Sequence, residues 1–151
     1  MTISIAALGE KVTHHIRNDE SLKSLRYIID GYNGDDWQTH VNFNEHTYHK
    51  ESVYKNDVIE IIVISWNTNQ KSKIHDHPDN GCLIKILRGC LSEEVYEKND
   101  SEFDLVKRNE LTTGMIGYQE GKHGLHKILN SDNKTISIHI YSPPNFVFRC
   151  Y

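Results

Sequence analysis

The chain contains few cysteines and few prolines, three of each among 151 residues. An odd cysteine count in a chain of this length argues against a disulfide-based scaffold. Long apolar runs are also absent, since none approaches the roughly 20 residues that a membrane-spanning helix requires. No basic stretch precedes the short apolar patch at the N-terminus, so a secretory signal peptide is not expected. We therefore expect a cytoplasmic protein that has no membrane partner.

Positive charge is scarce as well. The 17 Lys and Arg residues are outnumbered by 21 Asp and Glu residues, which gives a net charge of −4 without any basic block. Nucleic-acid binding therefore has no electrostatic support. The length predicts a single domain over residues 1–151, which we expect to act as a monomer. Histidine is the one unusual component, with ten residues.

The first 34 residues are expected to be helical. A weaker helical pattern covers roughly residues 3–16. A clearer pattern covers residues 19–31, where we expect Asp19 as the N-cap and Gly31 just past the last turn. Its apolar residues recur at helical spacing: Leu22, Leu25, Ile28 and Ile29.

Residues 35–151 consist of short β-prone runs separated by turn-forming residues. The runs predict strands at 38–43, 47–54, 58–66, 82–87, 91–97, 103–108, 115–118, 125–129, 135–141 and 146–151. The acidic run 93–102 is expected to form a solvated hairpin. Strands this short and evenly spaced predict an all-β fold, an antiparallel sandwich or small barrel with the N-terminal helices packed outside.

Two histidines one residue apart, His75 and His77, lie in the segment HDHPDNGC. On a strand both side chains would point to the same face, and neutral imidazole is a good ligand for Fe, Zn, Cu or Ni. Taken alone, a His-x-His pair fits a metal site no better than it fits one buried, hydrogen-bonded histidine and one exposed histidine. It becomes specific only with a third ligand, for which His126 in GLHKILN is the candidate.

A row of polar residues, Ser137, His139 and Tyr141, alternates with Ile138 and Ile140. If the isoleucines pack outside the barrel, the polar row faces its interior, where buried polar groups need hydrogen-bond partners. The alternative is a solvated strand face, in which case the isoleucine face would have to form the core alone.

These motifs together resemble known proteins. The His-x-His pair with Cys82 and Gly89 after it, followed by His126 and Asn130, resembles the two motifs of the cupin superfamily. Gly89 suits a barrel corner, where a positive φ is needed. With the segment SIHIYSPP at 137–144, the chain resembles the cysteine dioxygenases, a cupin-type thiol dioxygenase family, over roughly residues 45–144.

The resemblance implies a cupin fold, a small jelly-roll-like β-barrel, that holds an Fe(II) cofactor. The implied metal ligands are three: His75, His77 and His126. It further implies that Cys82 and Tyr141 lie side by side, take part in catalysis and can form a thioether crosslink. Ser137 and His139 would orient the Tyr141 hydroxyl, and Trp66 would pack beneath the site. Without the resemblance, the favoured interpretation of Cys82 is a small buried apolar residue, as most free cysteines are.

The resemblance also implies an enzyme that uses O₂ to oxidise L-cysteine to cysteine sulfinic acid, with the substrate on the iron through its thiolate and amine. Substrate-binding roles are implied for Tyr48, Lys50 and His139. Family members that act on cysteine carry Tyr-x-Arg where this chain has Tyr48 and Lys50, and lysine lacks the bidentate fork of arginine. Another small thiol, 3-mercaptopropionate or cysteamine, therefore stays open, as does a non-catalytic metal-binding cupin.

Overall fold

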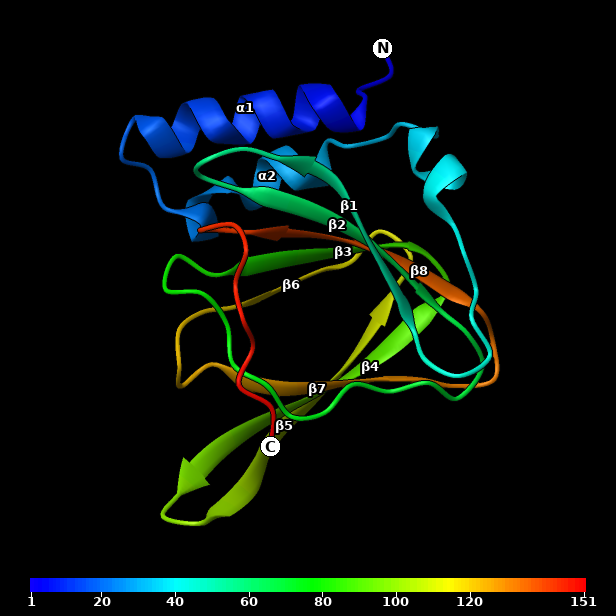
Figure 1. The fold of residues 1–151 in the computed structure, drawn as a ribbon, viewed down its shortest axis with the longest axis vertical. Helices are drawn as coiled ribbons and strands as arrows, with labels where there is room; N and C mark the ends of the chain where they lie inside the picture. Colours follow the sequence, from blue (N-terminus) through cyan, green and yellow to red (C-terminus); the bar gives the residue numbers. More distant parts are fainter.

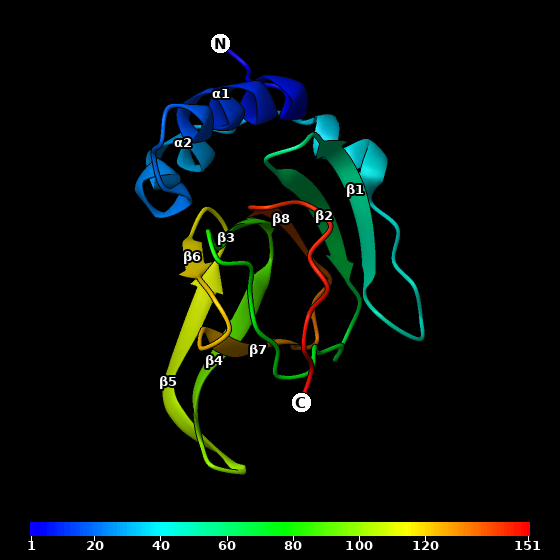
Figure 2. The ribbon, with the colours of Figure 1, turned by 60° about the vertical axis from the view of Figure 1, so that its left-hand side comes forward.

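The computed structural model describes residues 1–151 and contains two antiparallel sheets that face each other, with the N-terminal helices on the outer side of the larger sheet (Figures 1 and 2). The larger sheet has the strand order β1-β2-β8-β3-β6, and the smaller has the order β5-β4-β7. The strands are β1 His49–Lys55, β2 Glu60–Trp66, β3 Cys82–Arg88, β4 Cys90–Asn99, β5 Glu102–Thr112, β6 Ile116–Gln119, β7 Leu125–Asn130 and β8 Thr135–Tyr141. The chain is mostly strand with helices outside, as the sequence predicts.

The first helix, α1 (Ile5–Arg17), agrees with the helix predicted at 3–16. It begins after Ser4, whose side-chain hydroxyl accepts a hydrogen bond from the Ala7 N–H and so satisfies one of the free donors of the first turn. One face of α1 is buried, with Leu8 only 1% exposed. The helix is therefore held to the sheet by this apolar face.

The helix predicted at 19–31 is shorter and starts later. Asp19 has a φ of 62° and lies outside any helix, so it is not an N-cap. A 3-10 turn, η1 (Leu22–Leu25), precedes α2 (Arg26–Asp30). A 3-10 turn places residues three apart on one side, which buries both leucines of η1. Gly31 has a φ of −76° and needs no left-handed conformation. None of the helices combines the length and apolar character that crossing a membrane requires.

Lys85 joins the helical segment to the larger sheet. Its side chain is 8% exposed, and its Nζ donates hydrogen bonds to the carbonyls of Asp30 and Tyr32, both at 2.8 Å, and of Ile29 at 3.3 Å. Carbonyls at the end of a helix have no partner within the helix. The ammonium group supplies that partner and fixes α2 on β3.

Both faces of the larger sheet are buried. In β2, Ile61 and Val63 pack in a cluster with the helices, whereas Ile64 and Trp66 belong to a second cluster with residues of the smaller sheet. A strand that is covered on both faces has apolar residues at successive positions. This is why the run predicted at 58–66 shows no clean alternation.

Strand β8 keeps the two faces chemically separate. Its isoleucines, Ile136, Ile138 and Ile140, lie in the cluster on the helix side. Successive side chains of a strand alternate between faces, so the polar residues of β8 point into the space between the sheets, where they are buried. The expectation that the isoleucines pack outside the barrel is confirmed.

Two of the predicted strands are wrong. Residues 38–43 overlap a 3-10 turn, η2 (Asp36–His40), and belong to neither sheet. Residues 146–151 form one isolated bridge, between His75 and Cys150. This segment runs beside a loop (Figure 2), and a loop offers no regular ladder.

Candidate metal centre

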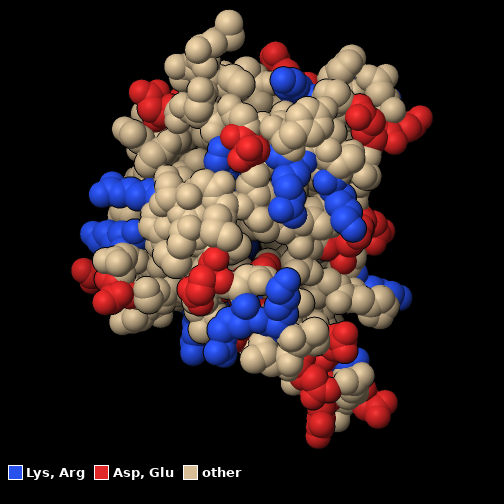
Figure 3. Space-filling view, turned by 180° about the vertical axis from the view of Figure 1, so that it is seen from behind, with Lys and Arg blue, Asp and Glu red and all other residues tan.

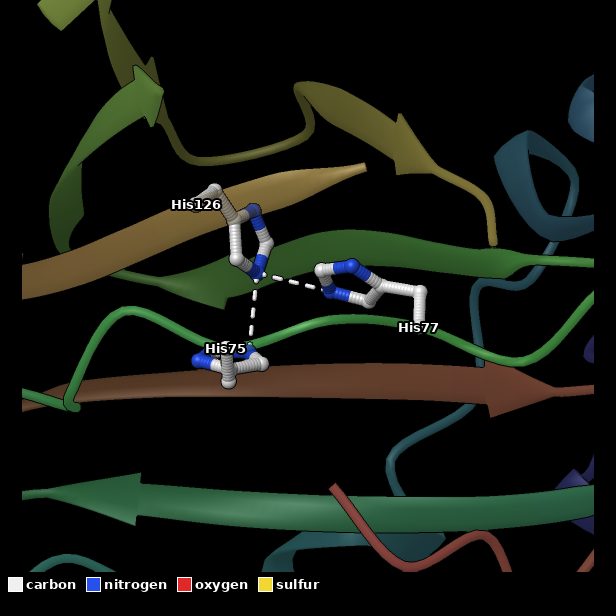
Figure 4. Close-up of side chains that lie close together, drawn as sticks. All are labelled: His75, His77 and His126. Atoms are coloured by element: carbon white, nitrogen blue, oxygen red, sulfur yellow. Dashed lines mark hydrogen bonds between the residues drawn. The ribbon is translucent and has the colours of Figure 1, made fainter. Parts of the chain in front are cut away.

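His75, His77 and His126 converge on one point inside the barrel (Figure 4). His126 lies on β7, while the other two lie on the loop between β2 and β3. The Nε2 atom of His126 is 2.9 Å from Nε2 of His77 and 3.1 Å from Nε2 of His75. His75 and His77 do not lie on a strand, so the prediction that strand alternation points both side chains the same way is wrong. A two-residue bridge between His75 and His126 aligns the loop with β7 instead.

The outer nitrogen of each imidazole has its own hydrogen-bond acceptor. Nδ1 of His75 lies 2.8 Å from the Lys73 carbonyl oxygen, and Nδ1 of His77 lies 2.6 Å from the Gly124 carbonyl oxygen. Nδ1 of His126 lies 2.8 Å from Oε2 of Glu93. A ring that donates from Nδ1 has its free lone pair on Nε2. All three lone pairs therefore point to the common centre.

The three imidazoles are neutral at neutral pH. Burial lowers the pKa of His75, and it lowers the pKa of His77 and His126 well below the ordinary histidine value. Neighbouring rings lower the pKa of His77 and His126 further. Neutral imidazole is the form that binds metal ions.

The spacing of the Nε2 atoms fits a single ion. Nitrogens bound to one ion at about 2.1 Å and at right angles lie about 3.0 Å apart, close to the 2.9 and 3.1 Å that separate Nε2 of His126 from the other two Nε2 atoms, and all three ligand nitrogens lie within 4.8 Å of one another. Three imidazoles leave further positions on an octahedral ion open for other ligands. The residues therefore fit a metal ion with open positions.

The polar row of β8 forms a hydrogen-bonded chain next to this centre. The Trp66 Nε1–H donates to Ser137 Oγ at 2.9 Å, Ser137 Oγ lies 2.8 Å from His139 Nε2, and His139 Nδ1 lies 3.2 Å from the Tyr141 hydroxyl. Burial lowers the pKa of His139 well below its ordinary value. The chain is therefore uncharged and ends at the Tyr141 hydroxyl.

Cys82 lies opposite Tyr141. The two residues are partners in the antiparallel register of β3 and β8, and both line the inner cavity. Burial raises the pKa of the Cys82 thiol and raises that of the Tyr141 hydroxyl well above its ordinary value. Both groups are therefore protonated at neutral pH.

Tyr48 and Lys50 stand at the mouth of the cavity. The inner cavity of about 20 Å³ has room for roughly one water molecule. Both residues, together with His75, also line an outer hollow of about 370 Å³. Tyr48 stacks on Trp66 with 4.5 Å between ring centroids. A small thiol that reaches the imidazoles must extend toward Lys50 and the outer hollow.

Lys50 forms no ion pair with an acidic side chain. Partial enclosure lowers its pKa, but the exposed side chain keeps contact with water, so the ammonium stays charged at neutral pH. Its Nζ lies 4.5 Å from the centroid of the Phe148 ring. An anionic group of a ligand would find an available cation here.

The sequence does not predict two of the residues that contact the site, Phe148 and Glu93. Phe148 packs edge-on against His75 at 5.3 Å and against Tyr141 at 5.6 Å between centroids. Glu93 was expected in the solvated hairpin but is 3% exposed. The acidic side chains toward the tip of the β4–β5 hairpin are exposed (Figure 3). Strand alternation, which places Glu93 on the same face as the buried Leu91, is the signal that could have identified it.

Two solved structures share this fold. A cupin superfamily protein from Desulfitobacterium hafniense is 14% identical with a TM-score of 0.57, and the match covers 73% of this chain and 90% of that protein. A Klebsiella pneumoniae protein with a double-stranded β-helix domain is 18% identical with a TM-score of 0.57, over 75% and 91% of the two chains. The fold is therefore the cupin fold, the double-stranded β-helix, as the sequence motifs imply.

Proteins related in sequence identify the family within this fold. Cysteine dioxygenase type 1 from Homo sapiens is 27% identical over 135 residues, which is 84% of this chain and 68% of the human protein. The Rattus norvegicus protein of the same name is 26% identical over the same shares. The family model described as cysteine dioxygenase type I matches residues 4–151. The chain therefore belongs to the cysteine dioxygenase type I family and is an oxidoreductase of that family.

Proposed function

We propose that this protein is an iron-dependent thiol dioxygenase that converts L-cysteine to cysteine sulfinic acid. The observation that carries the proposal is the convergence of three neutral imidazoles beside the Cys82–Tyr141 pair, in a chain of the cysteine dioxygenase family. The reaction adds both atoms of O₂ to the sulfur, so a thiol and O₂ give a sulfinic acid with no other reactant. The open positions around three protein ligands suit such a reaction.

The iron would be held by three side chains: His75, His77 and His126. Bound Fe(II) supplies a cation that lowers the thiol pKa of the substrate and open positions for thiolate, amine and O₂. A site made only of neutral imidazoles leaves the charge of the ion unreduced, which favours an anionic ligand such as a thiolate.

Lys50 and Tyr48 are proposed to hold the substrate carboxylate. The ammonium of Lys50 has no acidic partner and faces the cavity that a small thiol must occupy. A charge-assisted hydrogen bond from this group would orient the substrate. Because lysine has no bidentate fork, the hold on the carboxylate is expected to be looser than that of an arginine.

Tyr141 is proposed as the hydrogen-bond donor to the reacting atoms, and Cys82 as the neighbour that fixes its ring. The Tyr141 hydroxyl stays protonated because burial raises its pKa. Ser137 and His139 are proposed to set the direction of this hydroxyl through the chain that begins at Trp66. His139 also lines the cavity and is proposed to contact the substrate.

Among other small thiols, Lys50 favours those that carry a carboxylate. An ammonium at the cavity mouth attracts 3-mercaptopropionate and disfavours the cationic cysteamine. 3-Mercaptopropionate is therefore the second candidate substrate.

The test is O₂ consumption by Fe(II)-loaded protein with each thiol in turn. We expect consumption and sulfinate formation with cysteine, a smaller or comparable rate with 3-mercaptopropionate, and little with cysteamine. His126→Ala is the control that removes one proposed ligand and should abolish turnover. Protein that binds Fe(II) and consumes no O₂ with any of the three thiols would be a non-catalytic metal-binding cupin, and the proposed function would be wrong.

A further inference from the structure

Glu93 is a buried carboxylate behind the metal centre. It lies on β4, and its side chain is 4% exposed. Oε2 lies 2.8 Å from Nδ1 of His126, and Oε1 accepts a hydrogen bond from Nδ2 of Asn109 at 2.9 Å. Both carboxylate oxygens therefore have a partner, and one partner is a proposed metal ligand.

No cationic side chain balances this carboxylate. The structure contains no ion pair between Glu93 and any lysine or arginine, and the only basic side chain it contacts is the imidazole of His126. A charge removed from water is strongly destabilising unless it is paired or faces a metal ion. The imidazole of His126 has Glu93 at Nδ1 and the common centre at Nε2. A cation at that centre would balance the buried charge across the ring.

The other two imidazoles have neutral partners. Nδ1 of His75 and Nδ1 of His77 each face a backbone carbonyl. A hydrogen bond to either kind of acceptor fixes the tautomer, but a carboxylate also makes the ring a stronger electron donor. His126 is thus the ligand whose partner brings negative charge to a site that has no carboxylate ligand.

We propose that Glu93 is a positioning residue that fixes His126 with Nε2 toward the metal and supplies, through the ring, the negative charge that the three imidazoles lack. The inference rests on the metal site of the proposed function. Its consequences are tighter binding of a divalent ion and a lower Fe(III)/Fe(II) potential than three histidines with neutral partners would give.

The test compares dissociation constants of the full chain for Fe(II) and Co(II), measured without O₂ and without thiol. Glu93→Gln keeps an acceptor of the same shape and removes the charge. We expect it to bind both ions roughly 10- to 100-fold more weakly and to have a higher midpoint potential. Equal constants for wild type and Glu93→Gln would overturn the proposal.

Glu94→Gln is the matched control. Glu94 is the next residue on β4, on the opposite face, where its carboxylate accepts hydrogen bonds from Arg108 and Tyr96. The variant removes the same charge from the same strand, so we expect metal affinity within roughly twofold of wild type. An equal loss of affinity in both variants would show an effect of net charge and would overturn the role of Glu93.

A second measurement needs no variant. Nitrogen chemical shifts of the metal-free wild type should show His126 protonated at Nδ1 and free at Nε2, and the opposite tautomer would overturn the proposal even if Glu93→Gln does not fold. Wild type that binds neither ion would overturn this proposal together with the proposed function. Wild type that binds both ions without oxidising any thiol would overturn the proposed dioxygenase function but not the role of Glu93. The Glu93 comparison depends only on metal binding.

Discussion

Cys82 on β3 and Tyr141 on β8 lie directly opposite each other in the larger sheet, and both side chains face the inner cavity. Residues paired in this way have Cβ atoms about 4.5–5.5 Å apart, and each of these two residues is 5% exposed. A thiol and a phenol ring are therefore held together, away from water, beside three converging imidazoles. The backbone register makes this pairing a property of the fold.

This pairing predicts a thioether crosslink. When the protein turns over a thiol with Fe(II) and O₂, the Cys82 sulfur should bond to a ring carbon of Tyr141. The thiol hydrogen and one ring hydrogen would leave, and O₂ would accept the two electrons. Intact-mass measurement should show the loss of two hydrogens in wild type and none in Cys82→Ser or Tyr141→Phe.

Cys90→Ser is the matched control for the crosslink. Cys90 begins β4, and its sulfur lies 3.7 Å from a carboxylate oxygen of Glu110, so it has no part in the pairing. This variant should lose the two hydrogens as wild type does. An unchanged mass in wild type that oxidises thiol would contradict the crosslink while leaving the dioxygenase activity intact.

Lys50 is expected to select thiols with a carboxylate. A hydrogen bond to a charged group contributes about 1.5–3 kcal/mol, which corresponds to roughly 10- to 100-fold in affinity. Lys50→Gln should therefore raise KM for cysteine and 3-mercaptopropionate by about that factor, with little effect on KM for cysteamine. Lys50→Arg should lower KM for cysteine, because it adds a bidentate fork. Steady-state O₂ consumption gives the KM of wild type and of both variants for each thiol.

The control for Lys50 is Lys73→Gln. Lys73 lines the outer hollow but not the inner cavity, so the variant removes a positive charge from the same region without touching the proposed carboxylate position. Its KM values should stay within roughly twofold of wild type at 0.15 M salt, where exposed charges are largely screened. Equal effects of the two variants would mean that Lys50 acts only through general charge.

The site residues that the sequence predicts well alternate with apolar residues along a strand. Ser137, His139 and Tyr141 alternate with isoleucines, and alternation alone separates the cavity face of β8 from the face under the helices. For the three histidines, their spacing and the family resemblance make the prediction. Their convergence depends on the bridge that joins His75 to His126, which no local pattern encodes.

The parts that sequence predicts poorly depend on tertiary context. Residues 38–43 have β-prone composition but lie in a 3-10 turn and the segment after it, and residues 146–151 run beside the loop that carries His75. Glu93 stands in an acidic run that reads as solvated, yet the fold turns it inward against His126. Composition describes the run as a whole, and only the position within the strand distinguishes this one residue.

Buried histidines predict a loss of stability in mild acid for the metal-free protein. Burial lowers the folded-state pKa of four of them: His75, His77, His126 and His139. Below about pH 6.5 the unfolded chain protonates these side chains while the fold keeps them neutral. The unfolded state then binds more protons, so stability falls as pH drops, by at most about 1.4 kcal/mol per pH unit for each histidine. Urea unfolding at pH 7.5 and 5.5 measures the change in the free energy of unfolding.

Two variants separate the buried histidines from the surface ones. His139→Gln removes one buried ring and should reduce the pH dependence by up to about 1.4 kcal/mol per pH unit. His46→Gln changes an exposed residue and should leave the pH dependence as in wild type. Equal stability of wild type at the two pH values would contradict the prediction.

Lys85 is expected to stabilise the fold without affecting the metal centre. It bonds three carbonyls at the end of α2, on the helix side of the larger sheet. Lys85→Met should keep the side-chain volume but leave these carbonyls unpaired, which costs about 2–3 kcal/mol of unfolding free energy. Lys107→Met, on the exposed face of β5, is the control and should cost less than about 0.5 kcal/mol. Urea unfolding measures the loss, and faster amide exchange in residues 26–32 would locate it.

A loss of Co(II) affinity in Lys85→Met at a concentration where the protein is folded would contradict the separation of the two faces of the sheet, because the imidazoles lie on the side away from α2.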